Sequence, residues 1–291
     1  AELTLSIMAR QKLKNPQAGY ARDFIGLLNE CVEDARKNGV RILSNAGGMN
    51  IKGCVDAIAD LCRKKGLTGL KIGYVLGDDI TGEIDRLLAE GITFENIDGV
   101  GNFMDIKDKI VNANVYFGHE PIVECLSEDA DIIVTGRATD STLFLSPIMY
   151  ELGIKEDDWT NIARGIMAGH LLECGGQGAG GNFDYGWRDV PDMDQLGFPI
   201  AEFSMDELVI TKAPNCGGLI TEQSCKEQFL YEIHDPASYV TPDVIADISQ
   251  ATLTQVGKDR VSVAGIKGRR RPDTLKLSIG YHAGYKVAAM L

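Results

Sequence analysis

The first half of the chain alternates between strand-like and helix-like patterns of hydrophobic residues. Short apolar runs at residues 40–43, 70–76, 114–117 and 131–134 predict strands. Each run leads into a polar or glycine-containing loop and then into a segment with helical periodicity. Strands that alternate with helices in this way are typical of βαβ units. We therefore expect an α/β protein with a parallel, Rossmann-like sheet.

The second half has a different pattern. Residues 161–174 predict an apolar helix and residues 219–232 a further helix. Strand-like runs occur at 207–212, 241–248, 261–266 and 274–281. The β-branched alternation of DRVSVAGI and the turn GRRRPD favour antiparallel pairing there. We expect a parallel α/β domain over residues 1–158, and a Gly-rich helix–loop followed by an α+β region over residues 159–291.

The loops that follow the predicted parallel strands are the first candidate site. In such sheets the strand-to-helix loops meet at one edge, where ligands bind. The candidate ligand- or anion-binding residues there are Asn45, Gly47, Gly48, Asn50, Gly136, Arg137 and Asp140. Backbone N–H groups of the SNAGG loop at a helix N-terminus suit an anion, and a guanidinium can clamp a carboxylate or phosphate. A tight turn at SNAGG and an ion pair between Arg137 and Asp140 are the structural alternatives.

Acid–base candidates occur in the same loops. His119 follows the predicted strand 114–117 and has a side chain that titrates near neutral pH. Asp79, within GDD, is a further catalytic candidate, and the pair Asp78 and Asp79 could hold a divalent cation. The alternatives are a hydrogen-bonded structural histidine and a helix N-cap.

The segment GHLLECGGQGAGGNF carries the second candidate site. His170 shares a helical face with Glu173 and Cys174, which allows proton transfer or a cysteine nucleophile. The glycines after it predict close approach of the backbone to a ligand or to a packed neighbour, and we favour the ligand. The binding candidates in this half are Gly175, Gly176, Gly180, Gly181, Asn182, Lys212, Gly217 and Gly218. No metal site is predicted, because the H-x-x-E pair lacks a third ligand.

Composition excludes several classes of function. The formal net charge of −13 over 291 residues argues against a nucleic-acid or anionic-membrane surface. No stretch is long and apolar enough to span a membrane, and the odd, scattered set of seven cysteines favours reduced thiols in the cytoplasm. GxGxxG and Walker A fingerprints are absent, which removes the usual signals for dinucleotides and nucleotides.

Several long motifs resemble the acyclic terpene utilisation family, also called AtuA-like. They include SNAGGMN, GHEPIVECL, ADIIVTGRATDSTL, AGHLLECGGQGAGGNF and GGLITEQSCKEQFLYEIHDPASYVTPDV, and together the matching stretches span nearly the whole chain. Relatives of this family have a further strand and Gly loop before the AELT segment and further structure after GY. The resemblance thus implies that the first βα unit and a C-terminal portion are missing from this chain.

The resemblance also implies a metabolic setting. Members of the family occur together with acyl-CoA carboxylases, enoyl-CoA hydratases and CoA ligases in the breakdown of branched acids. We expect an enzyme of branched-chain or isoprenoid acyl-CoA catabolism, most plausibly a lyase or hydro-lyase that acts on an anionic CoA thioester. Coenzyme A would enter as part of the substrate, and a homo-oligomer is expected. The alternatives are a non-catalytic partner subunit of an acyl-CoA carboxylase or transferase and a metal- or nucleotide-dependent enzyme.

Overall fold

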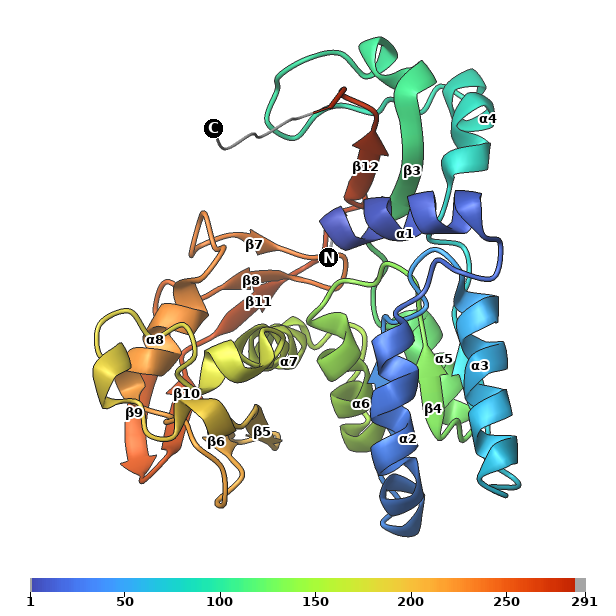
Figure 1. Ribbon diagram of the computed structural model, residues 1–291. Helices are drawn as coiled ribbons and strands as arrows, with labels where there is room; N and C mark the ends of the chain where they lie inside the picture. The colour runs from blue at the N-terminus through green and yellow to red at the C-terminus, as the bar shows by residue number, and fades with distance from the viewer. Residues whose placement is uncertain (1, 286–291) are drawn as a thin grey trace, which may run out of the picture. The chain divides into compact units, whose positions relative to one another are not determined.

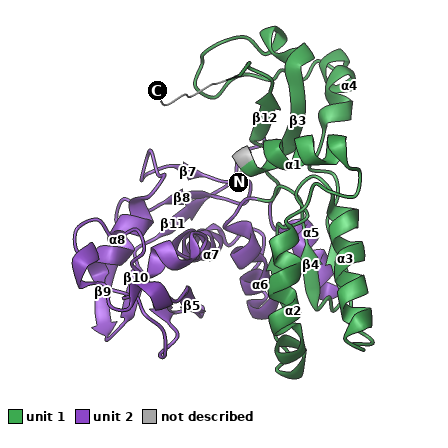
Figure 2. Cartoon of the chain, in the orientation of Figure 1, with its two compact units in different colours: residues 1–117, 129–138, 275–291 green, residues 118–128, 139–274 purple. Residues whose placement is uncertain are grey.

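The computed structural model describes residues 2–285 of the chain, which form two compact units (Figures 1 and 2). Unit 1 comprises residues 1–117, 129–138 and 275–291, and unit 2 comprises residues 118–128 and 139–274. The units are interleaved along the sequence, because the chain leaves unit 1 and returns to it twice. No helix among the described residues is long and apolar enough to cross a membrane.

The parallel sheet of unit 1 confirms the α/β prediction for that part of the chain. Its strand order is β1–β4–β2, and the strands are β1 (Ile42–Ser44), β4 (Ile132–Val134) and β2 (Ile72–Tyr74). Ser44 and Tyr74 both pair with Val134, so the carboxyl ends of all three strands lie at one edge. The central strand is fully buried, as its continuous apolar sequence requires.

Helices complete unit 1. They are α1 (Glu2–Lys14), α2 (Arg22–Lys37), α3 (Ile51–Lys64) and α4 (Ile84–Ala89). The side chain of Asn50 caps α3 by accepting a hydrogen bond from the backbone N–H of Gly53. Gly39, with φ of 66°, follows the last turn of α2 in the left-handed conformation that glycine adopts without strain. The apolar faces of α2 and α3 pack with β1 and β4 into one core that includes Leu28, Ile58 and Ile132.

The predicted strand at residues 114–117 does not belong to the parallel sheet. β3 (Ile110–Val115) pairs antiparallel with β12 (Leu277–Tyr281) in a separate two-stranded sheet. A local apolar run cannot show which partner a strand will find, and here the partner lies more than 160 residues away in sequence. The Rossmann-like arrangement expected from the sequence is therefore not confirmed.

Unit 2 is built around one buried helix. Its helices are α5 (Glu120–Ser127), α6 (Thr142–Leu152), α7 (Trp159–Leu172) and α8 (Glu222–Leu230). Residues 165–171 of α7 are all buried. Side chains from α6, α8 and the strands of this unit pack with Ile162, Ile166 and Leu171 in one hydrophobic core.

Two antiparallel sheets belong to unit 2, which confirms the predicted antiparallel pairing. The first has the order β5–β6–β10–β9, with β5 (Pro199–Phe203), β6 (Leu208–Lys212), β10 (Arg260–Ala264) and β9 (Thr252–Gly257). The second has the order β11–β8–β7, with β11 (Lys267–Arg269), β8 (Ile245–Asp247) and β7 (Tyr239–Val240). β11 occupies the start of the GRRRPD segment, where the sequence predicts a turn.

Candidate functional site

The edge of the parallel sheet in unit 1 brings together the SNAGG loop and the segment after β4. A Cβ atom on Gly47 would lie 2.6 Å from the carbonyl oxygen of Thr135, so this glycine permits close packing of the two loops. Gly48 has φ of 48°, and Asn50 donates its side-chain amide to the carbonyl of Ala18 at 2.9 Å. Local packing therefore explains much of this loop, and ligand binding by its residues stays a prediction.

The two aspartates of GDD occupy different environments. Asp78 is buried and accepts hydrogen bonds from the backbone N–H of Arg137 at 2.7 Å and from the side chain of Asn114 at 2.9 Å. Burial raises the pKa of this carboxyl. Asp79 is exposed, and its carboxylate accepts a hydrogen bond from the hydroxyl of Thr81 at 2.6 Å. These contacts close a local turn at Thr81, and a catalytic role for Asp79 stays a prediction.

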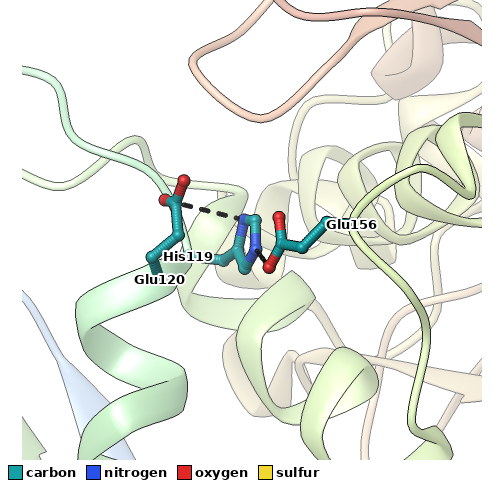
Figure 3. Close-up of side chains that lie close together, drawn as sticks. All are labelled: His119, Glu120 and Glu156. Atoms are coloured by element: carbon teal, nitrogen blue, oxygen red, sulfur yellow. Dashed lines mark hydrogen bonds and ion pairs between the residues drawn. The ribbon is translucent and has the colours of Figure 1, made fainter.

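The most highly organised polar centre of unit 2 surrounds His119. This side chain is 1% exposed, and its Nδ1 lies 2.7 Å from a carboxylate oxygen of Asp243. Its Nε2 lies 3.0 Å from a carboxylate oxygen of Glu156. Figure 3 shows the imidazole between the carboxylates of Glu120 and Glu156. The ring is thus held on one side by a buried acid and faces an exposed acid on the other.

Asp243 is fixed from several directions. The carboxylate oxygen that binds Nδ1 also accepts the backbone N–H of His119 at 2.8 Å, and its second oxygen accepts the hydroxyl of Thr142 at 2.5 Å. The residue lies in the turn between β7 and β8, which Thr241 closes through hydrogen bonds with Val244. A Cβ atom on Gly118 would lie 2.4 Å from the same carboxylate. Only glycine therefore allows the backbone to approach Asp243 so closely.

These partners determine the protonation state of His119. Burial lowers its pKa, but the hydrogen bonds and charge of Asp243 and the carboxylates of Glu156 and Glu120 outweigh that effect and raise the pKa to about 9. The imidazole is therefore protonated at neutral pH. A buried imidazolium that faces an exposed carboxylate is suited to donate a proton.

The rim of this centre contains further charged groups. Arg271 pairs with Glu120. Ligand atoms of His119, Glu120 and Glu156 lie within 4.8 Å of one another, a spacing that a metal ion could bridge. A metal ion would have to displace the proton from Nε2 and compete with Arg271 for Glu120. The pairings in this structure therefore favour proton transfer.

His170 forms a second buried centre in unit 2. Its ring is 1% exposed, and Nδ1 lies 3.4 Å from the carboxylate of Glu173, at the spacing that the shared helical face predicted. Its Nε2 has no hydrogen-bonding partner among the residues that the structure describes. Burial, followed by the charges of Glu173 and Asp140, raises the pKa of the neighbouring Tyr239 hydroxyl. Burial also raises the pKa of the Cys174 thiol, which opposes a role as nucleophile.

The glycine-rich segment packs against other parts of unit 2. A Cβ atom on Gly176 would lie 2.9 Å from Leu196, and one on Gly218 would lie 2.5 Å from the carbonyl oxygen of Ala179. The remaining binding candidates of this half, Gly175, Gly180, Gly181, Asn182 and Gly217, lie in the same packed segments. Lys212 donates to the carbonyl of Cys216 at 2.9 Å and closes the NCGG turn. Packing of neighbouring chain thus accounts for the close approach that the glycines predicted, and a ligand there stays untested.

Comparison with protein families identifies the chain. The model of the acyclic terpene utilisation family protein AtuA matches residues 1–291. The chain belongs to this family. Comparisons with curated proteins and with solved structures each gave no significant match.

The AtuA family motifs contain functional candidates that the sequence analysis did not select. Asp243 lies in PASYVTPDV and Arg271 in RRRPDTLKLSIGY, two stretches that resemble the family, whereas Glu156 lies in a segment with no such signal. Asp243 falls inside the predicted strand 241–248, whereas the structure places it in the turn between β7 and β8. The proline at position 242, which disfavours a continuous strand, was the available clue to the turn. Its contact with His119 joins residues 124 apart, a separation that local patterns do not reveal.

Proposed function

We propose that this AtuA-family chain is an enzyme of branched-chain or isoprenoid acyl-CoA catabolism, a lyase or hydro-lyase that acts on a CoA thioester. The observation that carries the proposal is the contact of 3.0 Å between Nε2 of His119 and the carboxylate of Glu156. The raised pKa of His119 agrees with an imidazole that donates a proton there. Lyases and hydro-lyases need an acid and a base that act together on neighbouring atoms of the substrate. The proposal includes the cytoplasmic location and the homo-oligomer expected from the sequence.

For a lyase, the substrate would be a 3-hydroxy-3-methyl acyl-CoA. Glu156 takes the proton from the 3-hydroxyl group, the C2–C3 bond breaks, and its electron pair forms the enolate of the shorter thioester. His119 then gives its Nε2 proton to the enolate carbon, and a ketone leaves. Transfer of a proton from Glu156 back to His119 restores both groups.

For a hydro-lyase the two groups exchange their positions of action on the substrate. Glu156 removes the proton from C2, His119 protonates the departing 3-hydroxyl group, and water and an enoyl-CoA are the products. Asp243 does not contact the substrate in either reaction. Asp243 positions the imidazole of His119 and stabilises its protonated form.

The test is turnover of CoA esters of 3-hydroxy-3-methylglutaryl type by the purified protein. His119→Gln should lower kcat by roughly a hundredfold or more, as loss of a general acid does. The matched control is His234→Gln, since His234 is exposed and lies outside this centre. Addition of EDTA should leave the rate unchanged.

Other results would contradict the proposal. If His119→Gln turned over the substrate as fast as the wild type, His119 would not be the general acid. Absence of turnover and of any thermal shift with CoA esters, together with co-purification of an acyl-CoA carboxylase or transferase, would support the non-catalytic subunit instead. Loss of activity in EDTA would favour a metal-dependent reaction.

A further inference from the structure

Four polar side chains of unit 2 meet in a cluster apart from the residues that contact His119. The cluster comprises His170, Glu173, Gln228 and Tyr239, and we call it the His170 cluster. Its members come from α7 and the residue that ends it, from α8 and from β7 (Figure 1). The side-chain amide of Gln228 donates a hydrogen bond to the backbone carbonyl of His170 at 3.2 Å. The centroid of the Tyr239 ring lies 5.5 Å from that of the imidazole, so distant segments meet around one histidine.

Two members of the cluster carry buried polar atoms without a hydrogen-bonding partner in the described part of the chain. These atoms are both ring nitrogens of His170 and the amide oxygen Oε1 of Gln228. His170 is 1% exposed and Gln228 is 3% exposed, so bulk solvent does not reach them. Buried polar groups of folded proteins are nearly always paired, with protein, ordered water or a ligand. The His170 cluster is therefore suited to a small polar guest.

The chemistry of these atoms shows what such a guest must offer. Nδ1 of His170 lies 3.4 Å from the carboxylate of Glu173, without the alignment of a hydrogen bond. A carboxylate at that position favours the tautomer that carries its proton on Nδ1, and Nε2 is then an acceptor. The amide oxygen of Gln228 can only accept. The guest must therefore donate hydrogen bonds in at least two directions.

The electrostatic surroundings of the cluster are negative. Burial raises the pKa of the Tyr239 hydroxyl, and the charges of Glu173 and Asp140 act in the same direction. Burial raises the pKa of the Cys174 thiol as well, and Glu173 and Glu232 add to that effect. A guest with a positive charge would be stabilised by these carboxylates. The face of an aromatic ring such as that of Tyr239 also attracts a cation.

A divalent metal ion fits this cluster less well. Within the described residues, three metal-binding atoms of His, Cys, Asp or Glu lie within 4.8 Å of one another around His119, and the His170 cluster has no such set. Calcium and magnesium bind mainly to several oxygen ligands, often carboxylates. A cation with a single charge and several N–H groups matches both the acceptors and the charge of the cluster.

We propose that the His170 cluster binds a small ammonium ion. The ion donates one N–H group to Nε2 of His170 and a second to Oε1 of Gln228, and the carboxylate of Glu173 balances its charge. This site is independent of the His119 reaction. It gives His170 a role in ligand binding, in place of the proton transfer considered from the sequence.

The test is an NMR titration of the full chain with ammonium chloride, in which tetramethylammonium chloride keeps the ionic strength constant. Saturable shifts of the ring signals of His170 and Tyr239 are expected. They should occur in the wild type and in His119→Gln alike, so failure of the catalytic proposal would leave this result intact. Potassium has a similar size but no N–H groups, and it should bind roughly tenfold more weakly or not at all.

Two variants test the contacts of the ion. Gln228→Met keeps a long side chain but removes the acceptor, and it should weaken ammonium binding roughly tenfold, the usual effect of losing a hydrogen bond to a charged group. The matched control is Gln250→Met at an exposed position, which should have no effect. Glu173→Gln guards against misfolding of the first variant, because it removes the charge and hardly changes the size of the side chain. It should weaken binding to a similar degree.

Three results would overturn the proposal. The first is the absence of saturable shifts in the wild type. The second is ammonium binding that both Gln228→Met and Glu173→Gln leave unchanged. The third is potassium binding as tight as that of ammonium, because hydrogen-bond donation would then play no part.

Discussion

His119 lies among groups that change its pKa in opposite directions. Its burial disfavours the charged imidazole, whereas Asp243 contacts both its Nδ1 and its backbone N–H and favours the charged form. The electrostatic attraction wins because Asp243 is itself fully enclosed and cannot be screened by water. The contact between Asp243 and His119 therefore fixes the imidazole in place and also stabilises the folded state.

The stabilisation by protonated His119 predicts that the free energy of unfolding depends on pH. The pKa of His119 is raised from 6.5 to about 9, so its contribution is fully present below pH 6.5 and is lost as the pH rises toward 9. The loss is on the order of 3 kcal/mol. Asp243→Asn should lower the His119 pKa, measured by NMR titration, and flatten urea-unfolding free energies across this window. An unchanged His119 pKa in Asp243→Asn, equal to that of the control Glu30→Gln at an exposed residue of α2, would show that Asp243 is not the cause.

The α6–α7 pair illustrates how single residues control the packing of elements. A Cβ atom on Gly169 of α7 would lie 2.6 Å from the carbonyl oxygen of Ser141, the residue that precedes α6. Backbone at that distance cannot move aside as a flexible side chain can. The apolar pattern of α7 predicted that the helix is buried, but not which neighbour its glycines approach.

Alanine substitutions should separate close packing from helix propensity. Gly169→Ala is expected to destabilise unit 2 by about 1–3 kcal/mol through overpacking. The matched control is Gly26→Ala in α2, where a Cβ atom would meet nothing within 4 Å and should stabilise by roughly 0.5–1 kcal/mol. Thermal and urea unfolding of both variants would measure the contrast. A stabilising Gly169→Ala would refute the close contact between these elements.

At the scale of the whole molecule, the two units are not consecutive in sequence. Unit 1 receives its last strand, β12, from residues after unit 2. Unit 2 receives His119 from residues 118–128, which lie in sequence between two stretches of unit 1. The boundary near residue 158 marks a change of pattern along the chain. It would separate β3 from β12 and His119 from Asp243.

A fragment of residues 1–158 tests this interleaving. It would lack β12, which covers the edge of β3, and Asp243, the partner of His119. We expect the fragment to unfold without a cooperative transition in circular dichroism and to regain one when co-expressed with residues 159–291. A fragment that melts as sharply as the full chain would show that residues 1–158 form an independent domain.

The sequence by itself determined most helices, the short strands β1, β2 and β4, and the loops that follow them, because hydrophobic period and capping residues act over a few neighbours. It also indicated His119 and His170 as titratable side chains, and His170 and Glu173 as neighbours on one helix. Only the tertiary structure decided that β3 pairs with β12 and that Asp243 contacts His119 and favours its protonated form. It also placed the guanidinium of Arg137 over the ring of Tyr116, beside aliphatic side chains. Each of these depends on contacts between distant segments, and such contacts follow from the packing of the whole chain.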